Sequence, residues 1–104
     1  MADPPAGGLL SSSIKMFFVY AIYNPLRKKI YIGHTEDLAK RIERHNGLLK
    51  NKAKSFTSKN SGSWNVVHVE PFHSRSEAML REKKLKSARG RRFIWTIIEE
   101  KLPP

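Results

Sequence analysis

The alternation of apolar and polar positions divides the chain into short segments that predict strands and helices. Residues 17–23 are mostly aromatic or β-branched on both alternating faces, which is typical of a strand buried on both sides. A turn is expected at residues 24–25, and residues 29–33 predict a second short strand that pairs with the first as a hairpin. A third strand is expected over residues 64–72, ended by Pro71.

The segment after the second strand carries the signals that start and stop a helix. Thr35 is the expected N-cap, and Glu36 and Asp37 complement the positive end of a helix dipole. The helix is expected to run to about His45, because the Asn-Gly pair that ends at Gly47 stops it.

Two further helices are expected near the C-terminal end of the sequence. Ser74 and Glu77 match a capping box, so a helix should open there and reach about Ser87. A last helix is expected after residues 88–90, where apolar residues recur at helical spacing. These apolar residues are Phe93, Ile94, Ile97 and Ile98.

The expected order of elements is therefore β-β-α-β-α-α. A three-stranded, mostly antiparallel sheet flanked by helices is the simplest α+β architecture that buries these apolar faces. The length of 104 residues fits one compact domain, which we place at residues 16–101. Residues 1–15 are rich in Pro, Gly, Ser and Ala, and we expect a disordered tail, or a remnant foreign to the natural chain, outside the domain.

The charge balance indicates a polyanionic partner. The chain has 20 Lys and Arg residues against 9 Asp and Glu residues, a formal net charge of +11. Nucleic acid is the usual partner of such a chain, although charge alone does not separate a nuclease from a ribosome-associated protein. The lysines expected to contact the DNA or RNA backbone are Lys50, Lys52, Lys54, Lys59, Lys83 and Lys84. For Lys83, Lys84 and Lys86 the structural alternative is a solvated helix face.

Composition and motifs exclude several other classes. The absence of cysteine excludes disulfides and thiolate metal sites, and fits a cytoplasmic location. The longest apolar run, residues 16–22, is too short to span a bilayer, so no membrane partner is expected. The chain has neither a phosphate-binding G-x-x-x-x-G-K-[ST] loop nor an H-E-x-x-H helix. By their spacing the histidines form no metal-ligand cluster: His34, His45, His68 and His73.

Two predicted helices each carry a charged residue on their apolar side. Arg41, with His45, borders the stripe that Leu38 and Ile42 define in the first helix. Because burying an unpaired charge is costly, Arg41 needs a partner, a cleft or a ligand.

The same argument applies to Glu82, which lies between Ala78 and Leu85 on the next helix. One interpretation is an ion pair between Arg41 and Glu82 that joins the two helices. The other places both at a concave site, with Arg41 on phosphate oxygens and Glu82 on a divalent cation. Glu70, near the end of a strand, is the second candidate for the cation.

At this point the motifs resemble a known family. Residues 18–20 read Phe-Val-Tyr and residues 31–33 read Tyr-Ile-Gly, eleven positions apart from tyrosine to tyrosine. Together with the Arg-bearing run at 33–42 and the Glu-bearing run at 76–82, they resemble the GIY-YIG endonuclease superfamily. The similarity covers residues 17–98 and is closest to the small stand-alone bacterial members.

The resemblance implies a role for each matching residue. Tyr31 would lie beside the nucleophilic water and act as, or assist, the general base, and Tyr20 would orient water or phosphate in the same pocket. Arg41 would neutralise charge that grows on the phosphate. Glu82 would be the sole protein ligand of one Mg²⁺ or Mn²⁺ ion. Gly33 would allow close backbone approach at the end of its strand.

Two positions depart from the family pattern, and one adds to it. Phe18 replaces the first glycine of the name-giving motif, at a position with no chemical function. His34 stands where some relatives carry lysine, and could change phosphate contacts or supply another proton carrier. His45, one turn after Arg41, is expected in a supporting role.

The leading hypothesis is a metal-dependent endonuclease that hydrolyses DNA through in-line attack of water. The alternative is a nucleic-acid-binding module of the same fold with weak or no catalysis, and RNA remains an alternative substrate. A structural RNA-associated protein would rest on charge alone. In so small a domain, specificity is expected to come from DNA shape, as in repair or recombination, or from a partner protein.

Overall fold

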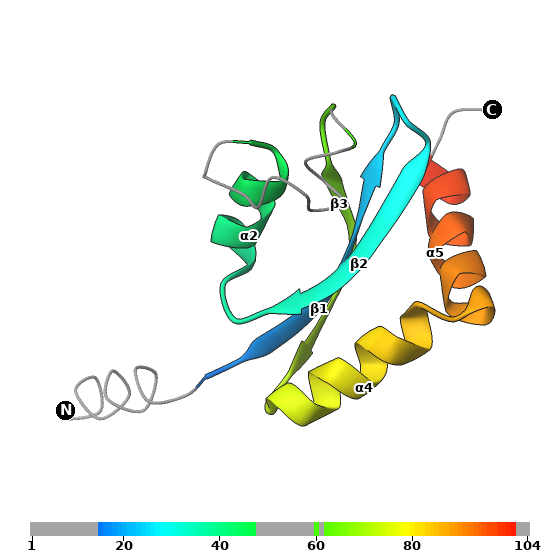
Figure 1. Ribbon diagram of the computed structural model, residues 1–104. Coiled ribbons are helices and arrows are strands. Elements are labelled where there is room, and N and C mark those ends of the chain that lie inside the picture. Colours follow the sequence, from blue (N-terminus) through cyan, green and yellow to red (C-terminus); the bar gives the residue numbers. More distant parts are fainter. Residues whose placement is uncertain (1–14, 48–59, 61, 102–104) are drawn as a thin grey trace, which may run out of the picture.

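The chain folds into a three-stranded sheet with helices on both faces. The computed structural model describes residues 15–47, 60 and 62–101. The order β-β-α-β-α-α and the α+β class are as predicted (Figure 1). The elements are β1 (Phe17–Asn24), β2 (Lys29–Thr35), α2 (Leu38–His45), β3 (Asn65–Phe72), α4 (Arg75–Leu85) and α5 (Ala88–Lys101).

Strand β1 is the centre of the sheet, whose order is β2-β1-β3 with both pairings antiparallel. The apolar character of β1 on both faces follows from this position, because each face is covered. Val19, Tyr20, Ala21 and Ile22 are all fully buried. The predicted two-sided burial and the hairpin with β2 are therefore confirmed.

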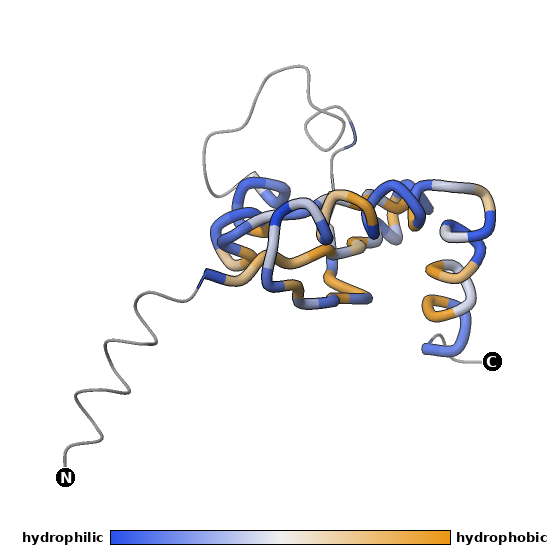
Figure 2. Tube along the Cα trace, turned by 90° about the horizontal axis from the view of Figure 1, so that it is seen from below, coloured by the Kyte–Doolittle hydropathy of each residue, from blue (hydrophilic) through white to orange (hydrophobic). Residues whose placement is uncertain are grey.

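Alternating residues of the strands form two separate clusters. Val19 and Ala21 pack with residues of β2, α4 and α5 in the larger cluster, whereas Tyr20, Ile22 and Trp64 form a smaller one on the side of α2. Figure 1 shows α2 on one side of the sheet and α4 and α5 on the other. In Figure 2, apolar turns of the C-terminal helix lie on the side that faces the rest of the molecule.

The first helix begins two residues later than the sequence predicts. Thr35 is the last residue of β2 and pairs with Phe18, so its backbone is held in the sheet. The N-cap is Asp37, whose Oδ1 accepts a hydrogen bond of 3.1 Å from the Lys40 amide. The Thr35 hydroxyl instead accepts from the Asp37 amide. The predicted end at His45 is confirmed, and Gly47 adopts a positive φ of 80°.

Strand β3 ends at Phe72, as the expected range of 64–72 has it, and Pro71 lies within the strand rather than after it. Proline is tolerated here because β3 is an edge strand, where a missing amide hydrogen costs no ladder bond on the open side. Trp64 precedes the strand and is buried. Its amide donates to Asn46 Oδ1 at 2.6 Å, and this contact ties the end of α2 to the start of β3.

The start of α4 is as predicted, and the junction with α5 differs. Ser74 Oγ accepts a hydrogen bond from the Glu77 amide, which confirms the cap. Helix α4 ends at Leu85 rather than near Ser87, and α5 begins at Ala88.

Gly90 is therefore part of α5 rather than of the linker before it. A Cβ atom on Gly90 would lie 2.4 Å from the Leu85 Cα, so the helices cross too closely for any side chain here. This crossing sets the angle at which α5 leaves α4. No helix among the described residues is long and apolar enough to cross a membrane.

Candidate active site

Three aromatic rings from three elements meet on the α2 side of the sheet. Tyr20 comes from β1, Tyr31 from β2 and His45 from the last turn of α2. The Tyr20 hydroxyl and His45 Nε2 are hydrogen-bonded at 2.8 Å. The ring centroid of Tyr31 lies 4.9 Å from that of His45 and 6.3 Å from that of Tyr20. The structure thus brings together both predicted tyrosines and the histidine.

Gly33 makes this packing of rings sterically feasible. It pairs with Tyr20 across the two strands. A Cβ atom on Gly33 would lie 2.8 Å from the Tyr20 hydroxyl oxygen and 3.1 Å from Tyr31 Cε2. The close approach predicted at Gly33 is therefore found, and the groups that approach it are the two tyrosine side chains.

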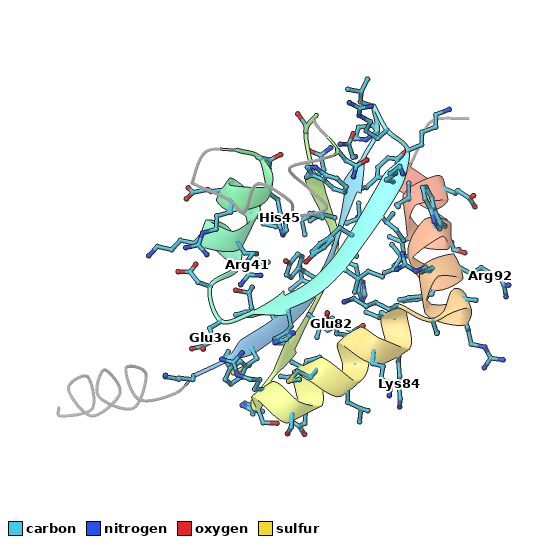
Figure 3. The ribbon with its side chains drawn as sticks, in the orientation of Figure 1. Glu36, Arg41, His45, Glu82, Lys84 and Arg92 are labelled. Atoms are coloured by element: carbon cyan, nitrogen blue, oxygen red, sulfur yellow. The ribbon has the colours of Figure 1, made fainter. Side chains whose placement is uncertain are left out.

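Arg41 lies one turn before His45 on the same helix. Figure 3 shows both side chains on the side of α2 that faces the sheet. Burial and the charge of Arg41 lower the pKa of His45 to about 4, so its imidazole is neutral at neutral pH. Burial, aided by the neighbouring Tyr31, raises the pKa of Tyr20 above its usual range although Arg41 opposes the shift. Tyr20 therefore keeps its proton at neutral pH.

Glu82 lies on α4 and is held by two basic side chains. Its Oε1 is 2.5 Å from Nδ1 of His34 on β2, and its Oε2 is 2.6 Å from Nζ of Lys86. Its side chain is 16% exposed. Burial alone would raise the pKa of the Glu82 carboxyl, but the hydrogen bonds of Lys86 and His34 outweigh it and hold the pKa below its usual value. Glu82 is thus ionised at neutral pH.

The edge strand β2 separates the two groups of side chains. Tyr31 and Gly33 face α2, whereas His34 faces α4, because neighbouring residues of a strand point to opposite faces. Figure 3 shows Arg41 and Glu82 on opposite sides of β2. Among the described residues Glu82 pairs with His34 and Lys86 and not with Arg41. The interhelical ion pair, the structural alternative for these charges, is therefore not formed.

Comparison with known protein families matches the GIY-YIG catalytic domain to residues 16–95. The chain belongs to the GIY-YIG family. Membership makes this a nuclease-type domain, with DNA as the implied substrate. The comparison with curated proteins found no match.

Within this GIY-YIG domain, Glu82 is a carboxylate that borders an open hollow. It lines a hollow of about 350 Å³ together with Met79, Lys83 and Lys86. In the described part of the chain no three potential ligands of the His, Cys, Asp or Glu type gather at one point. A single ionised carboxylate suits a hard cation that keeps several waters and also binds phosphate oxygens.

Glu70, the second candidate for the cation, is already engaged in a structural contact. Arg81 donates to its two carboxylate oxygens, at 2.8 Å from Nε and 2.9 Å from Nη2. His68 Nε2 lies 2.6 Å from Glu70 Oε2. The hydrogen bond from Arg81 and that from His68 lower the pKa of Glu70 despite partial burial. These contacts make Glu70 a link between β3 and α4 in the GIY-YIG domain.

The predicted lysine contacts fall in three groups. Lys83 is exposed and lines the same hollow as Glu82. Lys84 is also exposed, but it points away from the sheet in Figure 3. Four others lie outside the described residues, namely Lys50, Lys52, Lys54 and Lys59. The sequence interpretation missed the contact of Lys86 with Glu82, although their spacing of four residues on one helix is a signal for such a pair.

The neutral state of His45 predicts a pH dependence of stability. Because its pKa of about 4 in the fold lies below about 6.5 in an unfolded chain, the unfolded state binds more protons between these values. The free energy of unfolding should therefore fall as the pH is lowered from about 6.5 to about 4. His45→Gln should flatten this slope, as measured by urea unfolding at several pH values. An unchanged slope in the variant would contradict the buried neutral imidazole.

Proposed function

We propose that this GIY-YIG domain is a divalent-metal-dependent endonuclease that hydrolyses DNA phosphodiester bonds through in-line attack of water. The observation that carries the proposal is the arrangement of the candidate residues around the edge strand β2. Tyr31 and Arg41 lie on one side of this strand, and the ionised Glu82 lies on the other. A phosphate at this open edge could contact groups from both faces.

Glu82 is the proposed ligand of a single Mg²⁺ or Mn²⁺ ion. The fit rests on its ionised carboxylate at a hollow that is open to solvent and large enough for a hydrated cation. When bound, the cation would supply Lewis-acid stabilisation to the phosphate. Lys86 and His34 hold the carboxylate oxygens in place through the contacts described above.

The remaining side chains have proposed roles that follow from their chemistry and their positions. Arg41 would neutralise the charge that develops on phosphate oxygens, since its forked donors suit them. Tyr20 keeps its proton, so it would orient water or phosphate rather than remove a proton. Tyr31 would act as, or assist, the general base beside the water. His45 would hold the Tyr20 hydroxyl in position.

We further propose that the substrate is chosen by DNA shape, as expected of an enzyme of repair or recombination, or through a partner protein. The domain of residues 16–101 is small, and its described helices and strands are all used to build the core and the site. Cleavage of linear duplexes confined to one base sequence would overturn this part of the proposal.

The alternative is a nucleic-acid-binding module of the same fold that has weak or no catalysis. The observation that favours this alternative is the contact of Glu82 with His34 and Lys86. These two side chains satisfy both carboxylate oxygens without a cation.

A cleavage assay with Arg41→Ala separates the two functions. We expect the wild type to nick supercoiled plasmid and cut branched DNA with Mg²⁺ or Mn²⁺ and not with EDTA. Loss of Arg41 should lower the cleavage rate by about 10² to 10³, the usual effect of removing one donor that stabilises developing charge. Lys40→Ala, on the exposed side of the same helix, is the matched control and should cleave as the wild type does.

Absence of cleavage by the folded wild type on all these substrates, with salt-sensitive DNA binding retained, would favour the binding module. If Arg41→Ala cleaves DNA as fast as the wild type, the endonuclease proposal still holds, but the proposed catalytic role of Arg41 is refuted.

A further inference from the structure

A second hollow opens at the edge of β2, next to the one that contains Glu82. It has a volume of about 260 Å³ and is lined by Ile30, Tyr31, Ile32, Lys86 and Arg91. The two isoleucines are buried residues of β2, so they form its wall. The two basic residues come from the end of α4 and the first turns of α5. None of the residues that line it is acidic.

Lys86 connects this hollow to the candidate active site. It lines both hollows, one of which contains Glu82 and the other Tyr31. Basic residues therefore follow one another past the site, from Lys83 beside Glu82, through Lys86, to Arg91 beside Tyr31. A nucleic-acid strand whose reacting phosphate lay between Tyr31 and Glu82 would carry its next phosphate over one end of this row.

The fold fixes Arg91 and leaves most of its donors available. Its Nε donates to the Lys86 carbonyl oxygen at 3.1 Å, a contact that holds the guanidinium at the end of α4. A guanidinium has five N–H donors, and this bond uses one of them. Among the described residues no carboxylate forms an ion pair with Arg91. The remaining donors match the oxygens of a phosphate.

We propose that Arg91, together with Lys86, binds a backbone phosphate of the substrate strand next to the one that is cleaved. The proposal rests on the proposed function in one respect, that the DNA strand crosses the edge of β2. It assigns Arg91 to binding and not to chemistry. The neighbouring Arg92 provides a contrast, because it is exposed, lines neither hollow and points away from the sheet in Figure 3.

The test compares Arg91→Gln with Arg92→Gln, which remove the same charge one residue apart. Binding to a fluorescent branched DNA duplex is measured by anisotropy in EDTA, over a series of salt concentrations, so that no cleavage is needed. Loss of one phosphate contact should weaken binding about tenfold and reduce the slope of log affinity against log salt by about 1. We expect both effects for Arg91→Gln and neither for Arg92→Gln.

Arg91→Lys distinguishes phosphate binding from a structural role, because lysine keeps the charge and loses the Nε contact with the Lys86 carbonyl. Binding and salt slope near those of the wild type support the proposal. Binding as weak as that of Arg91→Gln, together with a lowered melting temperature in both variants, would overturn it in favour of a structural role. Equal losses in Arg91→Gln and Arg92→Gln would overturn it in favour of an unspecific charge effect.

These results are independent of whether the domain cleaves DNA. If the protein cleaves DNA with metal, but Arg91→Gln binds DNA no more weakly than Arg92→Gln, only the phosphate site at Arg91 is refuted. If the protein does not cleave DNA, but Arg91→Gln alone weakens DNA binding, the phosphate site is supported and the catalytic proposal is refuted.

Discussion

Replacing Glu82 by glutamine is expected to lower the rate of metal-dependent DNA cleavage by at least about a thousandfold. Charge stabilisation by a bound cation amounts to several kcal/mol, and each 1.36 kcal/mol corresponds to a factor of ten in rate. Glutamine has nearly the shape of glutamate, and its amide oxygen can still accept a hydrogen bond from Lys86 while its NH2 group faces His34 Nδ1, so the fold should persist. The rate is measured by plasmid nicking at saturating Mg²⁺ and Mn²⁺.

The control for this prediction is Glu99→Gln, an exposed residue of α5 that removes the same charge far from β2 along the chain. It should leave cleavage unchanged. Binding of Mn²⁺ alone, followed by calorimetry, should weaken in Glu82→Gln and not in the control. Cleavage by Glu82→Gln within tenfold of the wild type would refute its role as the cation ligand.

The second large effect is expected from Gly33→Ala, which adds one methyl group beneath the two tyrosines. That methyl would lie 2.8 Å from the Tyr20 hydroxyl oxygen, which is well inside van der Waals contact, and Tyr20 is fully buried. Tyr20 and Tyr31 must therefore shift. A displacement of about 1 Å in a catalytic group can cost about a hundredfold in rate, and we expect a loss of this size.

A double-mutant cycle with Tyr20→Phe tests the cause of that loss. Removing the hydroxyl takes away the shortest clash, so adding Gly33→Ala to Tyr20→Phe should cost much less than adding it to the wild type. Cleavage rates of the four proteins provide the coupling, and melting temperatures show whether each is folded. Additive losses would mean that the methyl group acts elsewhere, for example on the pairing of β1 with β2.

The helix ends show where local sequence signals succeed and where they fail. The cap at Ser74 is formed as predicted, because this residue lies between β3 and α4 and is not part of a strand. Thr35 has an equally good capping side chain, yet it pairs with Phe18 in the sheet and leaves the cap to Asp37. Strand pairing depends on a residue 17 positions away, which a local signal does not contain.

For the charged residues, too, the sequence predicts their positions on the helices but not their partners. The sequence places Arg41 and Glu82 on the inner sides of their helices, and both are partly buried there. It leaves open whether they pair with each other. In the structure Glu82 meets His34, 48 residues away, because α4 packs against the face of β2 opposite to α2. Glu70 of β3 likewise forms an ion pair with Arg81 of α4.

The kinds and order of the elements, the basic character of the protein and the motif of its family can all be derived from the amino-acid sequence. These properties depend on residue identity and on spacing along one segment, so they can be read locally. The partners of Glu82, the packing of Tyr20 and Tyr31 on Gly33, and the position of Arg91 beside β2 could not be derived in this way and follow from the three-dimensional fold. Each of these depends on strand register and helix crossing, which are set by contacts between residues distant in the sequence.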